Sequence, residues 1–212
     1  MCSTKNMEKV LSVRIKIFVI VGLILAATSK FLYISRLTPF PNFELIIPTL
    51  VVIGSFSLPC GPSKSWRLVT RYFGAFALLG VFLADLAIWG PLPIYAFTWS
   101  GFLVCWLIGM RNRLSLFDRF KKLLWRTTLA AAIAILIFDI WTAFGSWLGW
   151  GEKSLPGLVA IYLAQIPFTI YHLTSLVFVP PLVGLGKLMV KIKIPVSASV
   201  AVHAKTSQEV KR

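Results

Sequence analysis

The feature that most constrains the fold is a set of long apolar stretches in which charged residues are almost absent. Between residues 127 and 151, for example, Asp139 is the only charged residue. A helix needs about 20 apolar residues to cross a ~30 Å hydrocarbon core, where its backbone groups find no water. The whole chain of 212 residues is 58% hydrophobic and 14% charged, with a mean hydropathy of +0.82. These values predict an integral membrane protein.

Polar breaks divide the apolar sequence into six predicted transmembrane helices. They cover residues 12–29, 44–58, 68–89, 93–110, 124–148 and 157–188. The second is short, so we expect it to be tilted or partly buried. The last is long, and we expect Pro167 and the pair Pro180 and Pro181 to kink or divide it, because proline lacks the backbone N–H. We therefore predict one all-α domain, a compact six-helix bundle over residues 1–190, followed by a basic cytoplasmic tail over residues 191–212.

Lysine and arginine predict how these helices are oriented. Alternate flanks of the six predicted helices carry 19 basic residues on one side and 3 on the other. Basic residues accumulate on the cytoplasmic side, so both termini are predicted to be cytoplasmic in a multi-pass protein of the cell membrane. Residues 36–43, RLTPFPNF, then lie outside. In an alternative interpretation, the first apolar run is a cleaved signal peptide, which leaves five helices.

The remaining composition excludes several function classes. The net charge of +15 is explained by anionic lipid headgroups rather than nucleic acid, because no basic patch is interleaved with aromatic residues in a known module. The three cysteines have no paired spacing, so neither a disulfide framework nor a metal site is expected. No phosphate-binding loop or catalytic constellation is present, and we expect neither an enzyme nor a cofactor. Residues 111–126, RNRLSLFDRFKKLLWR, are expected to form a cytoplasmic amphipathic helix.

Ionisable residues inside apolar segments are costly, and they are therefore the first candidates for a functional site. The acidic ones gather toward the predicted outer side, where polar and aromatic residues of other helices join them. Such a set predicts an outward-opening cavity for a small solute. The candidate ligand-binding residues are Arg36, Asn42, Glu44, Asp85, Trp99, Asp139, Trp141, Thr142, Gln165 and His172.

Each of these residues also has a structural interpretation. Trp99 fits the interfacial aromatic belt as well as a ligand-stacking wall. Asp85 is expected either to contact the ligand or to pair with Lys30 or Arg36. Asp139, the candidate furthest from water, can instead belong to a structural pair, and His172 can simply bond to another helix.

Several motifs together resemble a small family of six-helix membrane proteins that is similar to the substrate-binding S components of energy-coupling factor transporters. The motifs are Arg36-x-x-Pro39-x-Pro41-Asn42-Phe43-x-x-Ile46, Thr142-x-Phe144-x-x-Trp147, Pro156-Gly157-Leu158, Tyr162, Ile166-Pro167-Phe168 and His172-Leu173. The resemblance implies capture of a vitamin or another micronutrient, with residues 36–43 as a lid. It also implies that Gly22 and Ala26 dock onto a transmembrane coupling subunit, which is driven by separate cytoplasmic ATPases.

The sequence thus predicts a non-enzymatic, membrane-embedded subunit that captures a small solute. A second hypothesis is a membrane scaffold or assembly protein that uses the same six helices to bind other proteins and takes no solute. The two hypotheses differ in whether the buried acidic residues meet a ligand or only other side chains.

Overall fold

The structure is a computed structural model, and it describes five separate positions between residues 17 and 28, then residues 45–55, 78–112 without 84 and 88, 114 and 118–190. Apart from one isolated bridge residue, Leu114, the ordered elements of this part are helices, which confirms the all-α class. The elements are α2 (Ile46–Ser55), α4 (Tyr95–Asn112), α5 (Phe120–Trp150), α6 (Leu155–Thr174), the 3-10 helix η1 (Ser175–Phe178) and α7 (Val179–Val190). A further short apolar helix covers Leu78–Ala87.

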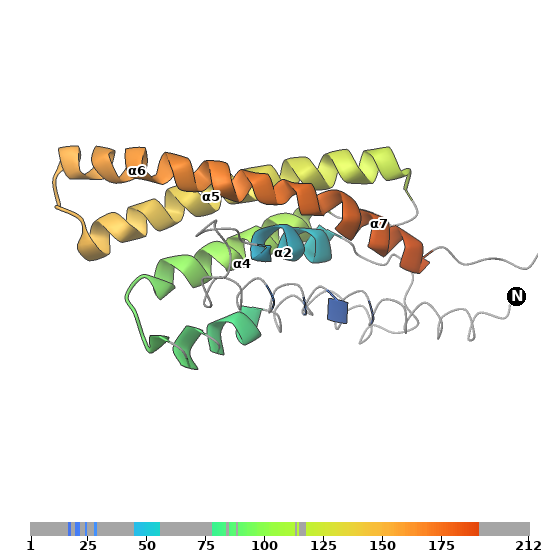
Figure 1. Ribbon diagram of the computed structural model, residues 1–212, viewed down its shortest axis with the longest axis horizontal. Helices are drawn as coiled ribbons and strands as arrows, with labels where there is room; N and C mark the ends of the chain where they lie inside the picture. The colour runs from blue at the N-terminus through green and yellow to red at the C-terminus, as the bar shows by residue number, and fades with distance from the viewer. Residues whose placement is uncertain are drawn as a thin grey trace, which may run out of the picture.

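Two of these helices are long and apolar enough to cross a membrane. One is α5, whose 31 residues reach about 46 Å at 1.5 Å per residue. The other is the composite of α6, η1 and α7, which is apolar over 34 residues from Leu155 to Leu188. A short turn joins the two, and they run side by side along the length of the molecule (Figure 1). This pair forms the frame on which α2 and α4 pack.

The composite helix is divided where the sequence predicts it. Pro180 and Pro181 have no backbone N–H to donate to the preceding turn, so the α-helical pattern cannot pass through them unchanged. The chain forms the 3-10 turn Ser175–Phe178 just before these prolines, and the N–H of Val179 donates to the carbonyl of Leu176. Pro167, in contrast, lies inside α6 without interrupting it.

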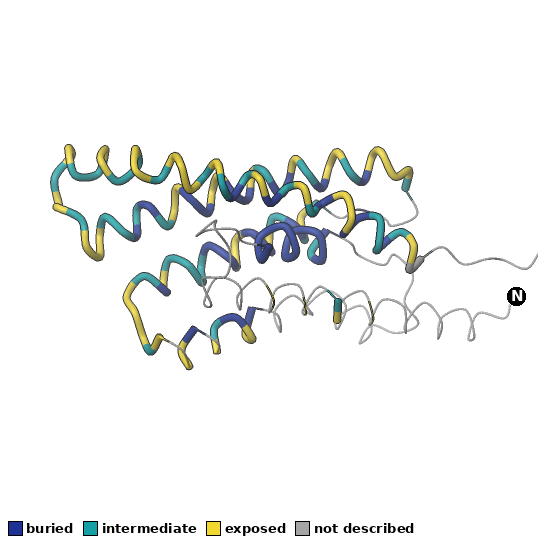
Figure 2. The backbone as a smooth tube through the Cα atoms, in the orientation of Figure 1, coloured by how far each residue is buried: buried dark blue, intermediate teal, exposed yellow. Residues whose placement is uncertain are grey.

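The centre of the bundle is α2, a helix of only 10 residues. Every residue of α2 except Gly54 is buried, as the dark blue segment in Figure 2 shows. Pro48 stands in its first turn, where a missing N–H costs no helical hydrogen bond, and the N–H of Thr49 donates to the carbonyl of Leu45. We expected the second predicted helix to be tilted or partly buried, and its described residues are almost all buried.

Two glycines allow α2 and α4 to approach until their backbones touch. A Cβ atom on Gly109 would lie 2.6 Å from the carbonyl oxygen of Val51 and 2.9 Å from its Cα. A Cβ atom on Gly54 would lie 2.9 Å from the carbonyl oxygen of Trp106. No side chain fits at either position, so small residues set the spacing of these helices, as they do at many helix contacts in membranes.

The segment before α5 differs from the expected amphipathic helix. α4 continues to Asn112, α5 begins at Phe120, and Leu114, Asp118 and Arg119 are not helical. Leu114 is buried, and its N–H donates to the carbonyl of Ser55 over 2.7 Å. The prediction was wrong because this leucine turns inward and satisfies the end of α2 instead of following a helical period.

The turn between α5 and α6 explains one of the sequence motifs. The hydroxyl of Ser154 accepts a hydrogen bond from the N–H of Gly157 and caps α6, and Pro156 follows in the first turn. A Cβ atom on Gly157 would lie 2.3 Å from the carbonyl oxygen of Glu152. Pro156 and Gly157 thus shape the start of α6.

Candidate functional site

The most unusual feature of the interior is a pair of ionisable side chains, Asp139 from α5 and His172 from α6. His172 Nδ1 and Asp139 Oδ1 are 2.6 Å apart, and the ring N–H donates to the carboxylate. Asp139 is 2% exposed and His172 is 7% exposed. Both lie near the middle of the two helices that can span a membrane, where polar groups are rare and need a partner.

Aromatic packing and a helix break position this pair. Phe138, the neighbour of Asp139 in α5, stacks on Phe102 of α4 at 4.8 Å between ring centroids and meets the His172 ring edge-on at 6.2 Å. His172 is three residues before the 3-10 turn, and its carbonyl accepts a hydrogen bond from the hydroxyl of Ser175. The break in the composite helix therefore begins three residues after the residue that contacts Asp139.

One oxygen of this site remains without a partner. Asp139 Oδ2 is buried and accepts no hydrogen bond from any described residue. Burying a carboxylate oxygen in this state is costly, because the oxygen has lost its hydrogen bonds to water and no protein donor replaces them. The arrangement can accept a hydrogen bond or hold part of a cationic group, which gives it the chemistry of a binding site.

A second polar contact joins the Leu78–Ala87 helix to α4. The indole N–H of Trp99 donates to Asp85 Oδ2 over 3.1 Å, and Asp85 is 1% exposed. The indole ring stacks with Phe82 at 4.7 Å and with Tyr95 at 5.0 Å. Trp99 is thus held between two rings and a carboxylate, a set of contacts that neither interpretation of Trp99 predicted. Tyr95 and Phe82 were not predicted, although Tyr95 precedes Trp99 by one helical turn.

We expect Trp99→Phe to lower the melting temperature of the purified protein by roughly 4 °C. The variant keeps a ring for stacking and removes the hydrogen bond to a buried carboxylate, which contributes about 1.5 kcal/mol. Trp125→Phe is the matched control, since Trp125 is 70% exposed on α5. Equal melting temperatures for the two variants, measured by intrinsic fluorescence in detergent, would show that the contact with Asp85 contributes nothing.

Trp141 belongs to a different surface, which we call the tryptophan groove. Its indole N–H donates to the hydroxyl of Ser100 over 2.8 Å, and its ring is 40% exposed. The groove has a volume of about 340 Å³ and is lined by Ser100, Gly101, Val104, Ile137, Ile140 and Trp141. Neither Asp139 nor His172 lines it, so the structure places Trp141 apart from the buried pair.

The other predicted site residues have diverse surroundings. The Thr142 hydroxyl donates to the carbonyl oxygens of Phe138 and Asp139 in its own helix, at 2.9 and 3.3 Å. Gln165 is half-buried on α6. Among the seven predicted site residues that the structure describes, it therefore brings together Asp139 with His172 and Asp85 with Trp99, and it places Trp141 in a separate groove.

Several predicted residues lie outside the described part of the chain. These are Arg36, Asn42 and Glu44 of the predicted site, Gly22 and Ala26 of the predicted docking face, and Lys30. Among the described residues, no group of three histidine, cysteine, aspartate or glutamate side chains is arranged to hold a metal ion.

A comparison with known protein families places the chain in a group. A model described as a family of unknown function, DUF6580, matches residues 11–197. The chain belongs to this family. The match covers both buried contacts, so Asp85, Trp99, Asp139 and His172 all lie within the DUF6580 region. No curated protein and no solved structure matches the chain.

Proposed function

We propose that this DUF6580 protein is a membrane-embedded subunit that captures a small solute for uptake, in the manner of the S components of energy-coupling factor transporters. In this proposal the chain crosses the cell membrane six times and binds a micronutrient such as a vitamin. A transmembrane coupling subunit and cytoplasmic ATPases, supplied by other chains, then complete the transport. The observation that carries the proposal is the buried pair of Asp139 and His172.

The surfaces of the two long helices support the membrane placement. On α5, Leu129 is 50% exposed and Ile140 is 58% exposed; on α6, Leu163 is 61% exposed. Yellow segments recur along the outer sides of both helices in Figure 2. Soluble monomers rarely expose apolar patches of this extent, whereas lipid covers them at no cost.

The buried pair supports a binding role because one of its hydrogen-bonding atoms has no partner among the described residues. A pair kept only for stability is expected to satisfy all of its hydrogen-bonding atoms. Here Asp139 Oδ2 has no described donor, and the two residues come from the helices that frame the bundle. A solute with an N–H or O–H donor, or with a cationic group, supplies the interaction that this carboxylate oxygen lacks. We therefore propose a donor-rich or cationic solute.

A membrane scaffold is the second candidate, and a specific observation favours it. Asp139 is already bonded to His172, and neither residue lines the two described grooves. In this function the pair locks α5 to α6, and the bundle offers its surface to other membrane proteins.

Mass spectrometry on gently purified protein separates the two functions. Small molecules extracted from the sample and proteins co-purified with it are identified together. The capture proposal predicts a stoichiometric small solute together with an ATPase partner. A stable complex with other membrane proteins, with no solute at any stage of purification, would contradict it and establish the scaffold.

A further inference from the structure

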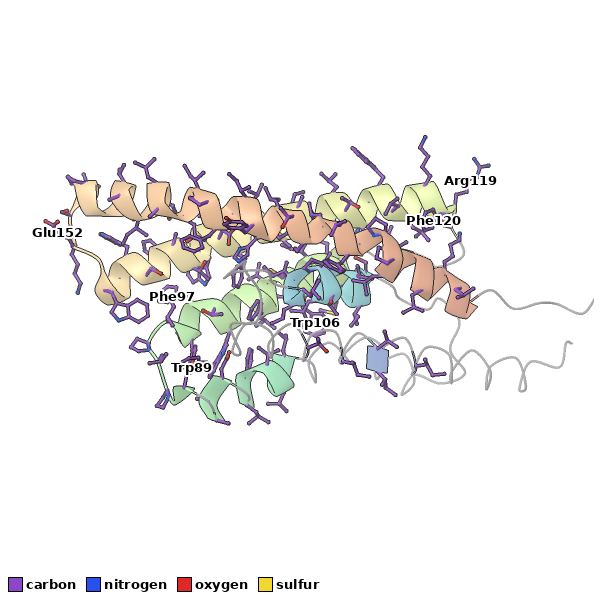
Figure 3. The ribbon with its side chains drawn as sticks, viewed as in Figure 1. Trp89, Phe97, Trp106, Arg119, Phe120 and Glu152 are labelled. Carbon is purple, nitrogen blue, oxygen red and sulfur yellow. The ribbon has the colours of Figure 1, made fainter. Side chains whose placement is uncertain are left out.

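Another groove, which we call the arginine groove, lies where the last turn of α4 meets the beginning of α5. It has a volume of about 340 Å³ and is lined by Ile108, Arg111, Asn112, Arg126, Leu129, Ala130 and Ile133. Arg119 and Phe120 mark this end of α5, and Glu152 lies at the far end of the same helix (Figure 3). The groove therefore belongs to the basic end of the molecule.

The lining of the arginine groove has two chemically different parts. Arg111 and Arg126, one from each helix, supply two exposed guanidinium groups. Asn112 lines the same groove and donates from Nδ2 to the carbonyl of Arg126 over 3.3 Å, which ties the two helices together. No carboxylate in the described part of the chain forms an ion pair with either arginine. The positive charge is thus available to a ligand.

The other part of the groove is apolar and extends away from the arginines. Leu129 and Ile133 follow Arg126 at helical spacing, and Ile108 precedes Arg111 in the same way. From Arg126 to Ile133 the helix rises about 10 Å, which takes the groove from the basic end into the apolar part of the bundle. Leu129 is 50% exposed and Ile133 is 44% exposed, so this wall is open to whatever surrounds the protein.

We propose that the arginine groove is a binding site for one anionic phospholipid. The phosphate lies against the guanidinium groups of Arg111 and Arg126, which recognise phosphate oxygens by paired hydrogen bonds, and one acyl chain lies along Leu129 and Ile133. Basic pockets between membrane helices on the cytoplasmic side favour such headgroups. This inference rests on the membrane placement proposed above, and it is independent of the solute at Asp139.

The combination of parts selects this ligand over simpler ones. A free phosphate ion would satisfy the arginines and leave the apolar wall in contact with water. A neutral lipid would cover the wall and give the guanidinium groups no net negative charge to neutralise. Only a ligand with both an anionic head and an acyl chain matches the whole groove.

The test compares lipid binding by the full-length protein and its variants. The wild type and the double variant Arg111→Gln, Arg126→Gln are purified in detergent and titrated with phosphatidylglycerol or phosphatidylcholine. Retained lipid is counted by native mass spectrometry. We expect one tightly held phosphatidylglycerol on the wild type, at least tenfold weaker binding of phosphatidylcholine, and at least tenfold weaker phosphatidylglycerol binding by the double variant.

Two controls make the result specific to the groove. Arg119→Gln removes one positive charge from the same end of α5 without touching the groove lining, and it should leave the affinity for phosphatidylglycerol unchanged within twofold. Glycerol 3-phosphate and inorganic phosphate test the head without a chain, and neither should displace the lipid at millimolar concentration. Equal binding of both lipids, an equal loss for Arg119→Gln, or displacement by inorganic phosphate would overturn the proposal.

The lipid site and the membrane placement can be tested independently of each other. Incorporation of the wild type into lipid nanodiscs tests the placement by itself. A protein that enters nanodiscs and shows no preference for phosphatidylglycerol refutes the lipid site alone.

Discussion

Replacing Gly109 with alanine is expected to lower the melting temperature of the purified protein by roughly 8 °C. The added methyl group would stand 2.6 Å from the carbonyl oxygen of Val51, and the obstacle is backbone that cannot rotate away. The helix that would have to move, α2, is buried on nearly every side. Overpacking of this kind costs about 3 kcal/mol, which corresponds to roughly this shift in melting temperature.

Gly149→Ala provides the matched control for this prediction. A Cβ atom at Gly149 meets nothing within 4 Å, and this position is also helical. Alanine is a better helix former than glycine by about 1 kcal/mol, so the control variant should melt at or above the wild-type temperature. The same substitution thus has opposite signs at two sites. If Gly109→Ala also raised the melting temperature, α2 and α4 would not be in contact at this point.

The second large effect concerns the buried pair. We expect Asp139→Ala and His172→Leu to destabilise the protein by about 3–5 kcal/mol each, because each removes one member of a buried hydrogen-bonded pair. The double variant should recover most of this loss, since alanine and leucine together keep about the combined volume of the pair and remove both of its polar members. The measurement is a double-mutant cycle of thermal unfolding in detergent.

The coupling energy between the two substitutions tests this prediction. A strongly non-additive cycle, with the double variant more stable than either single variant, confirms that the two side chains depend on each other. Additive losses would mean that Asp139 and His172 do not interact across α5 and α6. Trp141→Phe is a useful reference, because Trp141 is partly exposed and its partner Ser100 has other hydrogen bonds, to the carbonyls of Ala96 and Phe97.

Much of the helical framework could be predicted because hydrophobicity and proline act locally. The apolar length of α5 and the division of the last helix before Pro180 follow directly from the residues in those segments. The prediction of a helix at Leu114 failed because of a contact with a residue that is distant in the sequence. An amphipathic period predicts a helix there, and a tertiary hydrogen bond from Leu114 to Ser55 overrides it.

The candidate site was predictable as a set of residues and not as an arrangement. The cost of burying charge identified Asp85, Asp139 and His172 from the sequence. Which of them meet depends on the rotation and depth of each helix, which the sequence does not show. In the structure Asp139 contacts His172, and Asp85 accepts a hydrogen bond from Trp99. The contact between Gly54 and Gly109 was missed for the same reason, because spacing alone does not show which small residues face each other.

The central claim is that the carboxylate of Asp139, held by His172, binds a small solute. Native mass spectrometry of the wild type and of the double variant Asp139→Ala, His172→Leu, purified side by side from the same cells, tests it most directly. We predict that the wild type retains a small molecule, rich in hydrogen-bond donors or positively charged, and that the folded double variant loses it. The same bound mass in both proteins, or no bound molecule in the wild type, would contradict the claim.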